Sequence, residues 1–134
     1  METQKADEGV VIRSFDPARD TGFIVSTWPK AVYFGAIDEP STPWSTWATA
    51  VHEKIKQLLG TCEVRIASEA DKPLLIIGYS VVNDNRLEFV YVKKDYRGVG
   101  VGRLLCSGIG EYQPMNLTKA GLGFAKAMKM RAGR

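Results

Sequence analysis

The chain has 134 residues, of which 45% are hydrophobic and 25% charged, a composition that predicts one globular domain over residues 1–134 with the polar residues 1–8 as a flexible leader. The formal net charge of +3 is too small to indicate a dedicated nucleic-acid binder, whose basic surface must displace the counterions around the phosphates. Two cysteines and one histidine predict neither a disulfide framework nor a metal site, and without an apolar signal or membrane-spanning segment we expect a cytoplasmic protein.

The first predicted elements are a short strand and a helix. Residues 10–12 are apolar in succession, as in a strand. Asp16 supplies an N-cap oxygen and Pro17 a ring already at helical φ, so we expect a helix to begin there. Pro29 is expected to end this helix near Trp28, because proline lacks the N–H that a helix interior needs.

A loop and a second helix are predicted next. Residues 30–43 contain one glycine and two prolines and are expected to be irregular. Thr42 and Pro43 repeat the cap arrangement of the first helix, and Gly60 is expected to stop the second. Between these signals, apolar residues recur at steps of three and four, which is the period of an amphipathic helix. These residues are Trp44, Trp47, Ala48, Val51, Ile55, Leu58 and Leu59.

Three strand-like runs separated by turn residues follow. Residues 62–67 alternate between apolar and charged side chains, and residues 74–82 are almost continuously apolar, as in a central strand. Residues 83–85 form a tight-turn sequence that leads into a third run at 87–92. Strands joined by such short turns pair antiparallel, so the sequence predicts an antiparallel meander.

The C-terminal third is predicted to contain two helices and a brief strand. A helix begins within or just after the glycines of residues 97–102 and is expected to run to about Tyr112. Residues 114–117 are a candidate strand, and residues 119–131 a candidate last helix. Together with the earlier elements, this order indicates a mixed fold, α/β or α+β, with a central sheet and flanking helices.

The glycine-rich segment between the third strand of the meander and the next helix is the clearest functional motif. Its sequence is Arg97-Gly98-Val99-Gly100-Val101-Gly102. Glycines that open a helix let a phosphate approach the backbone N–H groups. A nucleotide-triphosphate loop would end in Gly-Lys-Ser/Thr, but Gly102 is followed by Arg103 and Leu104, and the spacing of a dinucleotide fingerprint fails in both frames.

The segment matches the pattern Arg/Gln-x-x-Gly-x-Gly/Ala at every fixed position. The strand before it ends in an apolar-aromatic-valine triplet, Val90-Tyr91-Val92, and the helix after it carries Leu104-Leu105. With these flanks, residues 87–105 resemble the acetyl-CoA motif of the GCN5-related N-acetyltransferases. The order of elements upstream, one strand, two helices and then three strands, is similar to that family as well.

This resemblance implies the fold, the co-substrate and a set of binding residues. The implied fold is a central, mostly antiparallel sheet flanked by helices, and the implied co-substrate is acetyl-CoA. In the family, the loop holds the pyrophosphate and the strand binds the pantetheine arm like an added strand. Carried over to this chain, the loop residues are Arg97, Gly98, Val99, Gly100, Val101 and Gly102, and the strand residues are Val90, Tyr91 and Val92.

Amide formation from a thioester needs a neutral amine, so a base must remove a proton from the acceptor. Glu88 is the candidate, because strand alternation places it on the same side as Val90 and Val92 unless a bulge intervenes, and many members of the family have an acidic residue on this strand. The alternative is that Glu88 is a solvent-facing charge. The proton donor for the leaving thiolate is expected to be water, Tyr79 or Tyr33.

The acceptor site is predicted near residues 30–47. Tyr33, Phe34, Trp44 and Trp47 would form an aromatic wall, and two acidic residues, Asp38 and Glu39, would attract an amine. The alternative is that the tryptophans are core residues of the second helix. The family usually adds a strand hairpin after the last helix, so we expect an open site, a site completed by a second subunit in a homodimer, or the loss of acetyl transfer.

The sequence therefore predicts an N-acetyltransferase that moves an acetyl group from acetyl-CoA to a primary amine, of a small molecule or a protein, by direct attack. Cys106 is expected to pack as a small apolar residue rather than act as a nucleophile. One alternative is a non-catalytic acyl-CoA-binding module of the same fold. Another is a nucleic-acid-associated protein that uses the basic C-terminal segment at residues 119–134.

Overall fold

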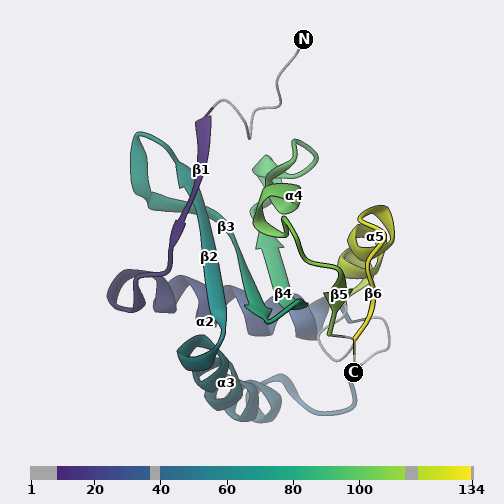
Figure 1. Ribbon diagram of the computed structural model, residues 1–134. Coiled ribbons are helices and arrows are strands. Elements are labelled where there is room, and N and C mark those ends of the chain that lie inside the picture. The colour runs from purple at the N-terminus through teal and green to yellow at the C-terminus, as the bar shows by residue number, and fades with distance from the viewer. Residues whose placement is uncertain (1–8, 37–39, 114–117, 134) are drawn as a thin grey trace.

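A computed structural model describes residues 9–36, 40–113 and 118–133 (Figure 1). The strands are β1 (Val10–Ser14), β2 (Glu63–Glu69), β3 (Lys72–Asn83), β4 (Arg86–Val92), β5 (Glu111–Tyr112) and β6 (Arg131–Ala132). The helices are α2 (Pro17–Phe34), α3 (Trp44–Thr61), the short 3₁₀ helix η1 (Lys94–Tyr96), α4 (Val101–Leu105) and α5 (Lys119–Ala127). No helix in these ranges is long and apolar enough to cross a membrane.

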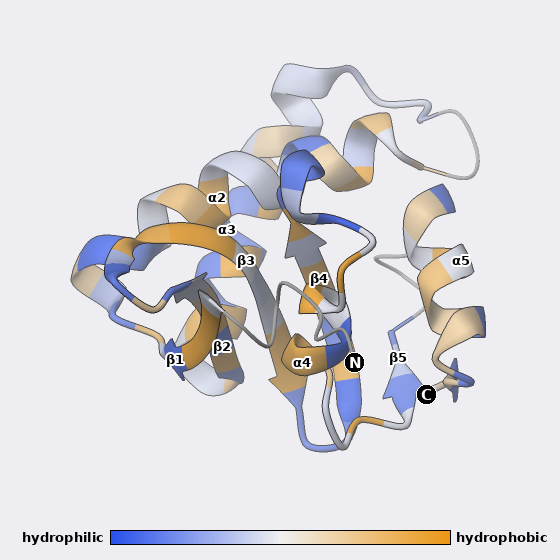
Figure 2. Ribbon diagram, turned by 90° about the horizontal axis from the view of Figure 1, so that it is seen from above, coloured by the Kyte–Doolittle hydropathy of each residue, from blue (hydrophilic) through white to orange (hydrophobic). Residues whose placement is uncertain are grey.

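The six strands form one sheet in the order β1-β2-β3-β4-β5-β6. Strands β1 to β4 pair antiparallel, whereas β5 and β6 add to the sheet in parallel, which confirms the mostly antiparallel sheet. Asn83 pairs with Arg86 across the turn, and Asp84 within it has a φ of 56°, as the turn chemistry predicted. The middle strand β3 is largely apolar (Figure 2).

Helices cover both faces of the sheet, and each face has its own hydrophobic cluster (Figure 1). Helices α2 and α3 cover one face, and α4 and α5 the other. The first cluster includes Ile24, Trp28, Ile55, Ile66, Tyr79 and Phe89. The second includes Ile77, Val82, Leu87, Val101, Leu105 and Ala125.

Helix α2 does not end at Pro29, as the sequence predicted, but continues to Phe34. A proline inside a helix removes one backbone hydrogen bond and costs about 3 kcal/mol. Pro29 and Trp28 are both buried, and the Trp28 ring stacks on Phe89 of β4 at 4.9 Å between centroids. This packing against the sheet stabilises the helix through the proline, and the loop that was expected to begin at residue 30 is correspondingly shorter.

Helix α3 covers the predicted range, but its ends differ from the cap arrangement that was expected. Pro43, rather than Thr42, is the N-cap residue, and no side chain caps the first turn. The helix runs through Gly60 and ends at Thr61. The apolar period therefore located the helix, while the expected cap at Thr42 was wrong.

The helix after the glycine loop is much shorter than predicted. Helix α4 ends at Leu105, because the chain turns at residues 106–109, where Gly108 has a φ of 81° and the Ile109 N–H bonds to the Cys106 carbonyl. Tyr112 consequently lies in strand β5. Residues 114–117, the candidate strand, and the expected leader 1–8 lie outside the described residues.

The last helix, α5, ends at Ala127 rather than at residue 131. Lys129 adopts a φ of 57°, and the Met130 N–H bonds back to the Ala125 carbonyl at 2.9 Å, which is a Schellman-type ending. At the other end, the Thr118 hydroxyl accepts from the Gly121 N–H at 2.9 Å. The turn after α5 sends the chain into β6, beside β5.

Two buried serines on neighbouring strands predict opposite changes in stability. The Ser80 hydroxyl donates to the Leu105 carbonyl at 2.8 Å, whereas the Ser68 hydroxyl has no partner among the described residues; both residues are 0% exposed. We expect Ser68→Ala to raise the free energy of unfolding by about 1 kcal/mol and Ser80→Ala to lower it by about 1–3 kcal/mol. Urea unfolding of the two variants tests this, and a shift of the same sign in both would contradict it.

Candidate functional site

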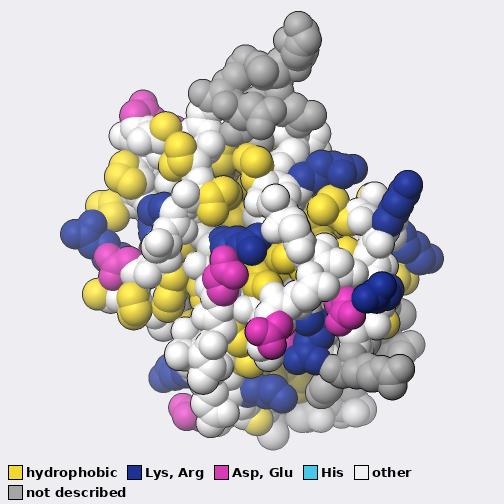
Figure 3. Space-filling model, in the orientation of Figure 1, with side chains coloured by type: hydrophobic (Ala, Val, Ile, Leu, Met, Phe, Trp, Pro, Cys, Tyr) yellow, Lys and Arg dark blue, Asp and Glu magenta, His cyan; other side chains and the backbone are white. Residues whose placement is uncertain are grey.

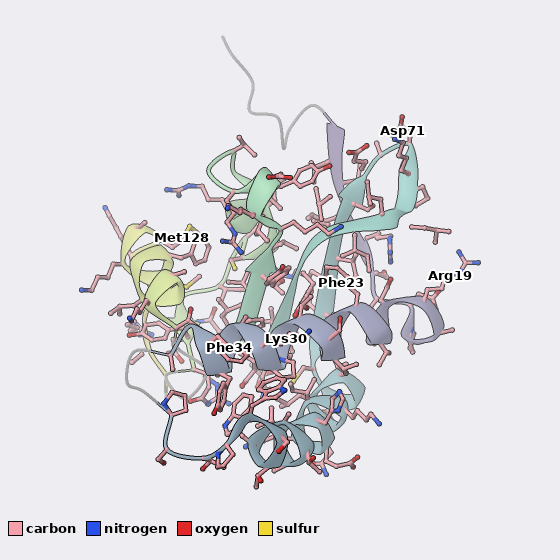
Figure 4. The ribbon with its side chains drawn as sticks, turned by 180° about the vertical axis from the view of Figure 1, so that it is seen from behind. Arg19, Phe23, Lys30, Phe34, Asp71 and Met128 are labelled. Atoms are coloured by element: carbon pink, nitrogen blue, oxygen red, sulfur yellow. The ribbon has the colours of Figure 1, made fainter. Side chains whose placement is uncertain are left out.

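A cavity of about 850 Å³ lies beside the outer edge of β4. One side is β4 itself, and the facing side is α5 with the residues just before it. The glycine-rich segment closes one end, and the last turns of α2, with Lys30 and Phe34, close the other (Figure 4). The end of α2 is tied to the start of α5, because the Lys119 N–H bonds to the Gly35 carbonyl at 2.9 Å.

The outer edge of β4 is covered by another strand at its first two residues only. Strand β5 pairs with β4 at Arg86 and Leu87, and the Gln113 N–H bonds to the Leu87 carbonyl at 2.7 Å. Beyond this point the edge borders the cavity along residues 88–92. A strand edge exposed in this way presents backbone donors and acceptors to whatever enters the cavity.

The register shows which backbone groups of β4 face the cavity. The Lys93 N–H bonds to Ile77 on the β3 side at 2.9 Å, whereas the Val92 carbonyl, one residue earlier, accepts from Arg97 Nε at 2.7 Å on the opposite side. Because successive residues of a strand alternate, the N–H and C=O groups of Val90 and Val92 face the cavity, and those of Phe89 and Tyr91 face β3.

The three glycines of the loop have different structural roles. Gly98 and Gly100 have φ values of 80° and 97°, a conformation that other residues rarely adopt. Gly102 is needed for packing, because a methyl group there would come 2.8 Å from the Phe124 ring of α5. Val101 is buried in the core and Val99 packs partly buried against it, so these two predicted binding residues do not line the cavity. Helix α4 that follows has only five residues.

The described lining of the cavity is strongly basic. Its cationic side chains are Lys30, Arg97, Arg103 and Lys119, and its only described acidic residue is Glu88. In the space-filling view, Lys and Arg side chains gather on the part of the surface that holds α4 and α5 (Figure 3). A cavity with this excess of positive charge attracts an anionic ligand.

Glu88 lies at a bulge, which corrects the expected strand alternation. Val81 pairs with Phe89 and Val82 with Leu87, so Glu88 is the extra residue of β4. The alternation that was expected to place the Glu88 side chain on the same face of the sheet as Val90 and Val92 is therefore interrupted at Glu88. Glu88 is 5% exposed, and its Oε2 accepts from Arg86 Nε at 3.1 Å and Nη2 at 3.0 Å. It is a buried, ion-paired carboxylate rather than a solvent-facing charge.

The two tyrosines that were candidate proton donors both lie outside the cavity lining. Tyr79 is 0% exposed and its hydroxyl is 2.7 Å from Thr27 Oγ1; burial raises the pKa of this phenol. Tyr33 donates to the Thr42 carbonyl at 2.6 Å. Tyr112 does line the cavity, from β5. The sequence placed Tyr112 at the end of a helix. Its position in the cavity lining follows only from the structure, in which α4 ends at Leu105 and Tyr112 belongs to β5.

Cys106 is a core residue, as predicted. It is 0% exposed, and burial raises the pKa of its thiol to about 12. A thiol of this kind remains protonated at neutral pH, when it is a poor nucleophile. Among the described residues, no group of histidine, cysteine and acidic side chains could hold a metal ion.

The four aromatic residues that were predicted to form an acceptor wall come together at the junction of α2 and α3. The Tyr33 ring lies 4.9 Å from Phe34 and 5.2 Å from both Trp44 and Trp47, measured between centroids. Phe34 is 70% exposed and lines the cavity, whereas the tryptophans are half-buried. The acidic residues at 38 and 39 lie outside the described residues.

No family model and no curated protein matches the sequence. Among solved structures, the GCN5-related N-acetyltransferase from Rhodopseudomonas palustris is 20% identical, with a TM-score of 0.53 over 96% of this chain and 69% of that one. The chain has the fold of a GCN5-related N-acetyltransferase. The structure of apo-form YjaB from Escherichia coli is also similar, at 18% identity and with a TM-score of 0.59 over 87% of this chain and 79% of that one.

Proposed function

We propose that the chain is an acyltransferase that uses acetyl-CoA as its co-substrate and a primary amine as its acceptor. The observation that carries the proposal is the open outer edge of β4, which borders a basic cavity of about 850 Å³. This volume lies in the ordinary range for small-molecule sites, about 300–1,000 Å³. The N-acetyltransferase fold supports the same assignment.

Each part of CoA has a complementary part of the cavity. The pantetheine arm carries amide groups, which can pair with the Val90 and Val92 backbone in the manner of an added strand. The diphosphate carries negative charge, which suits the N–H groups of residues 97–102 together with the Arg97 and Arg103 side chains. Arg97 Nε donates to the Val92 carbonyl at 2.7 Å, so an amide N–H of the ligand that bonds to this carbonyl would have to displace the Arg97 side chain.

The chemistry requires that the acceptor ammonium loses a proton, and we assign the role of base to Glu88 at the β4 bulge. The amine nitrogen then attacks the thioester carbonyl, the new C–N bond forms, the C–S bond breaks, and the nitrogen loses a second proton to give the neutral amide. The leaving thiolate takes up a proton, for which Tyr112 in the cavity lining is the candidate donor. No covalent enzyme intermediate is needed, and positioning of the two substrates supplies the remaining rate enhancement.

The backbone edge can be tested by Val90→Pro. Proline removes the N–H that faces the cavity but leaves the bonds between Phe89, Tyr91 and β3, because an edge strand tolerates proline on its outer side. We expect CoA affinity, measured by calorimetry, to fall by about tenfold or more. The pantetheine arm would lose a hydrogen bond to the strand and would fit the strand edge less closely. Val90→Ala keeps the N–H and should bind CoA nearly as the wild type does.

Calorimetry with CoA and a thiol-release assay with acetyl-CoA and amines together test the whole proposal. Heat of CoA binding accompanied by amine-dependent thiol release supports the transferase. Binding without release would favour the non-catalytic acyl-CoA-binding module instead. Absence of any CoA binding to the folded protein would contradict both.

A further inference from the structure

A second, smaller cavity of about 190 Å³ lies between α2 and α3, on the face of the sheet that these two helices cover. Its walls are mostly apolar. They consist of Trp28, Val32, Trp47, Val51, Ile55 and Leu58. Three polar residues complete the lining, namely Lys54, Glu88 and Gln113. Lys54 is exposed on α3, so its ammonium lies on the solvent side of this cavity.

The two cavities share part of their lining. Glu88 and Gln113 border both of them. Glu88 can do so because it is the extra residue at the β4 bulge, where the alternation of side chains between the two faces is interrupted. A group in the small cavity would therefore approach Glu88 from between α2 and α3, while a thioester in the large cavity would lie beside the outer edge of β4.

Given the acyltransferase function proposed above, on which this inference rests, we infer that the small cavity holds the acceptor, and that the acceptor is a free α-amino acid with a compact apolar side chain. Such a molecule carries three groups on one carbon. The apolar side chain suits the apolar walls, the carboxylate suits the Lys54 ammonium, and the α-amine is left at Glu88. The ammonium would join the ion pair that Glu88 already forms with Arg86.

The same lining disfavours other amines. A polyamine or an aminoglycoside needs several carboxylates, whereas Glu88 is the only acidic residue in the described lining of either cavity. A large acceptor would not enter the small cavity, because drug-sized ligands need about 300 Å³ or more. An amine that lacks an anionic group would gain no contact with the Lys54 ammonium.

The reaction balances without another reactant. The α-ammonium passes a proton to Glu88, its nitrogen forms the amide bond with the acetyl carbon, and the C–S bond of the thioester breaks. The nitrogen loses a second proton as the amide forms, the thiolate takes up one proton, and the proton on Glu88 returns to solvent. The products are an N-acetyl amino acid and CoA.

Occupation of the small cavity can be measured without CoA, because Trp28 and Trp47 line it and report on it by fluorescence. We expect a saturable change with L-leucine, about tenfold weaker binding of L-leucinamide, which lacks the carboxylate, and no saturable change with spermidine. If leucine produces no change in protein that binds CoA by calorimetry, the inference is wrong and the CoA site stands. If leucine binds but CoA does not, the amino-acid site is supported and the transferase proposal fails.

Matched variants on α3 test the two parts of the site. Lys54→Met should weaken leucine about tenfold and leave leucinamide unchanged, whereas Lys56→Met, an exposed lysine outside the lining, should change neither. Val51→Phe fills the cavity and should abolish leucine binding while CoA still binds, and Ala50→Phe, on the exposed side of α3, is its control. Equal weakening of leucine and leucinamide by Lys54→Met would overturn the role of Lys54, and unchanged leucine binding in Val51→Phe would overturn the site.

Discussion

Replacement of Glu88 by glutamine should lower kcat for acetyl transfer by about 10²–10⁴-fold while CoA still binds. A general base contributes about this much, and glutamine keeps the shape of the side chain but cannot accept the proton of the ammonium. Glu88 borders the cavity from the β4 bulge and is only 5% exposed. Water therefore has poor access to this position and cannot readily act as the base in place of Glu88. Steady-state kinetics by thiol release, with calorimetry of CoA binding on the same sample, measure the two effects separately.

The ion pair of Glu88 with Arg86 calls for a matched control. Glu111 also pairs with an arginine, Arg131, at 3.1 Å, and it lies outside the cavity lining. Glu111→Gln should therefore leave kcat close to that of the wild type. A similar loss of activity in both variants, or full activity in Glu88→Gln at unchanged thermal stability, would exclude Glu88 as the base.

Reversal of two charges at the loop should have the next largest effect. In the double variant Arg97→Glu/Arg103→Glu, two cations of the cavity become anions, so the phosphates of CoA meet like charges, a juxtaposition that costs several kcal/mol. We expect CoA affinity to fall by about 10²-fold or more. Calorimetry at two salt concentrations measures it, and the difference from wild type should shrink as salt screens the exposed charges.

The control for this double variant must change the net charge equally without touching the site. Lys56 and Lys72 are exposed, lie on α3 and at the start of β3, and do not line the large cavity. Lys56→Glu/Lys72→Glu should bind CoA nearly as the wild type does. An equal loss in both double variants would mean that overall charge, and not the residues of the loop, determines affinity.

The elements that the sequence predicted well are those whose signal is local. The apolar period of α3, the turn residues between β3 and β4, and the glycine pattern after β4 each depend on neighbours in the chain. The meander followed from strands joined by short turns. Local signals of this kind also predicted that Val90 to Val92 end a strand and that a glycine loop follows at 97–102, and the role of these residues with CoA stays a prediction.

The features that the sequence did not reveal depend on contacts between distant residues. Helix α2 continues through Pro29 because Trp28 packs on Phe89, about sixty residues away in the chain. The bulge at Glu88 depends on how β4 pairs with β3, and the residues next to Glu88 in the sequence do not predict it. The small cavity combines residues of α2, α3 and β4, so it exists only once these elements have packed.

The close approach of the Phe124 ring to Gly102 determines how the walls of the large cavity can move. With no side chain at Gly102, α5 rests directly on the loop backbone, and a methyl group there would already collide with the ring. A displacement of α5 away from β4 would therefore have to carry the glycine-rich segment with it or break this contact. The width of the large cavity between β4 and α5 is in this way linked to the position of the glycine-rich segment.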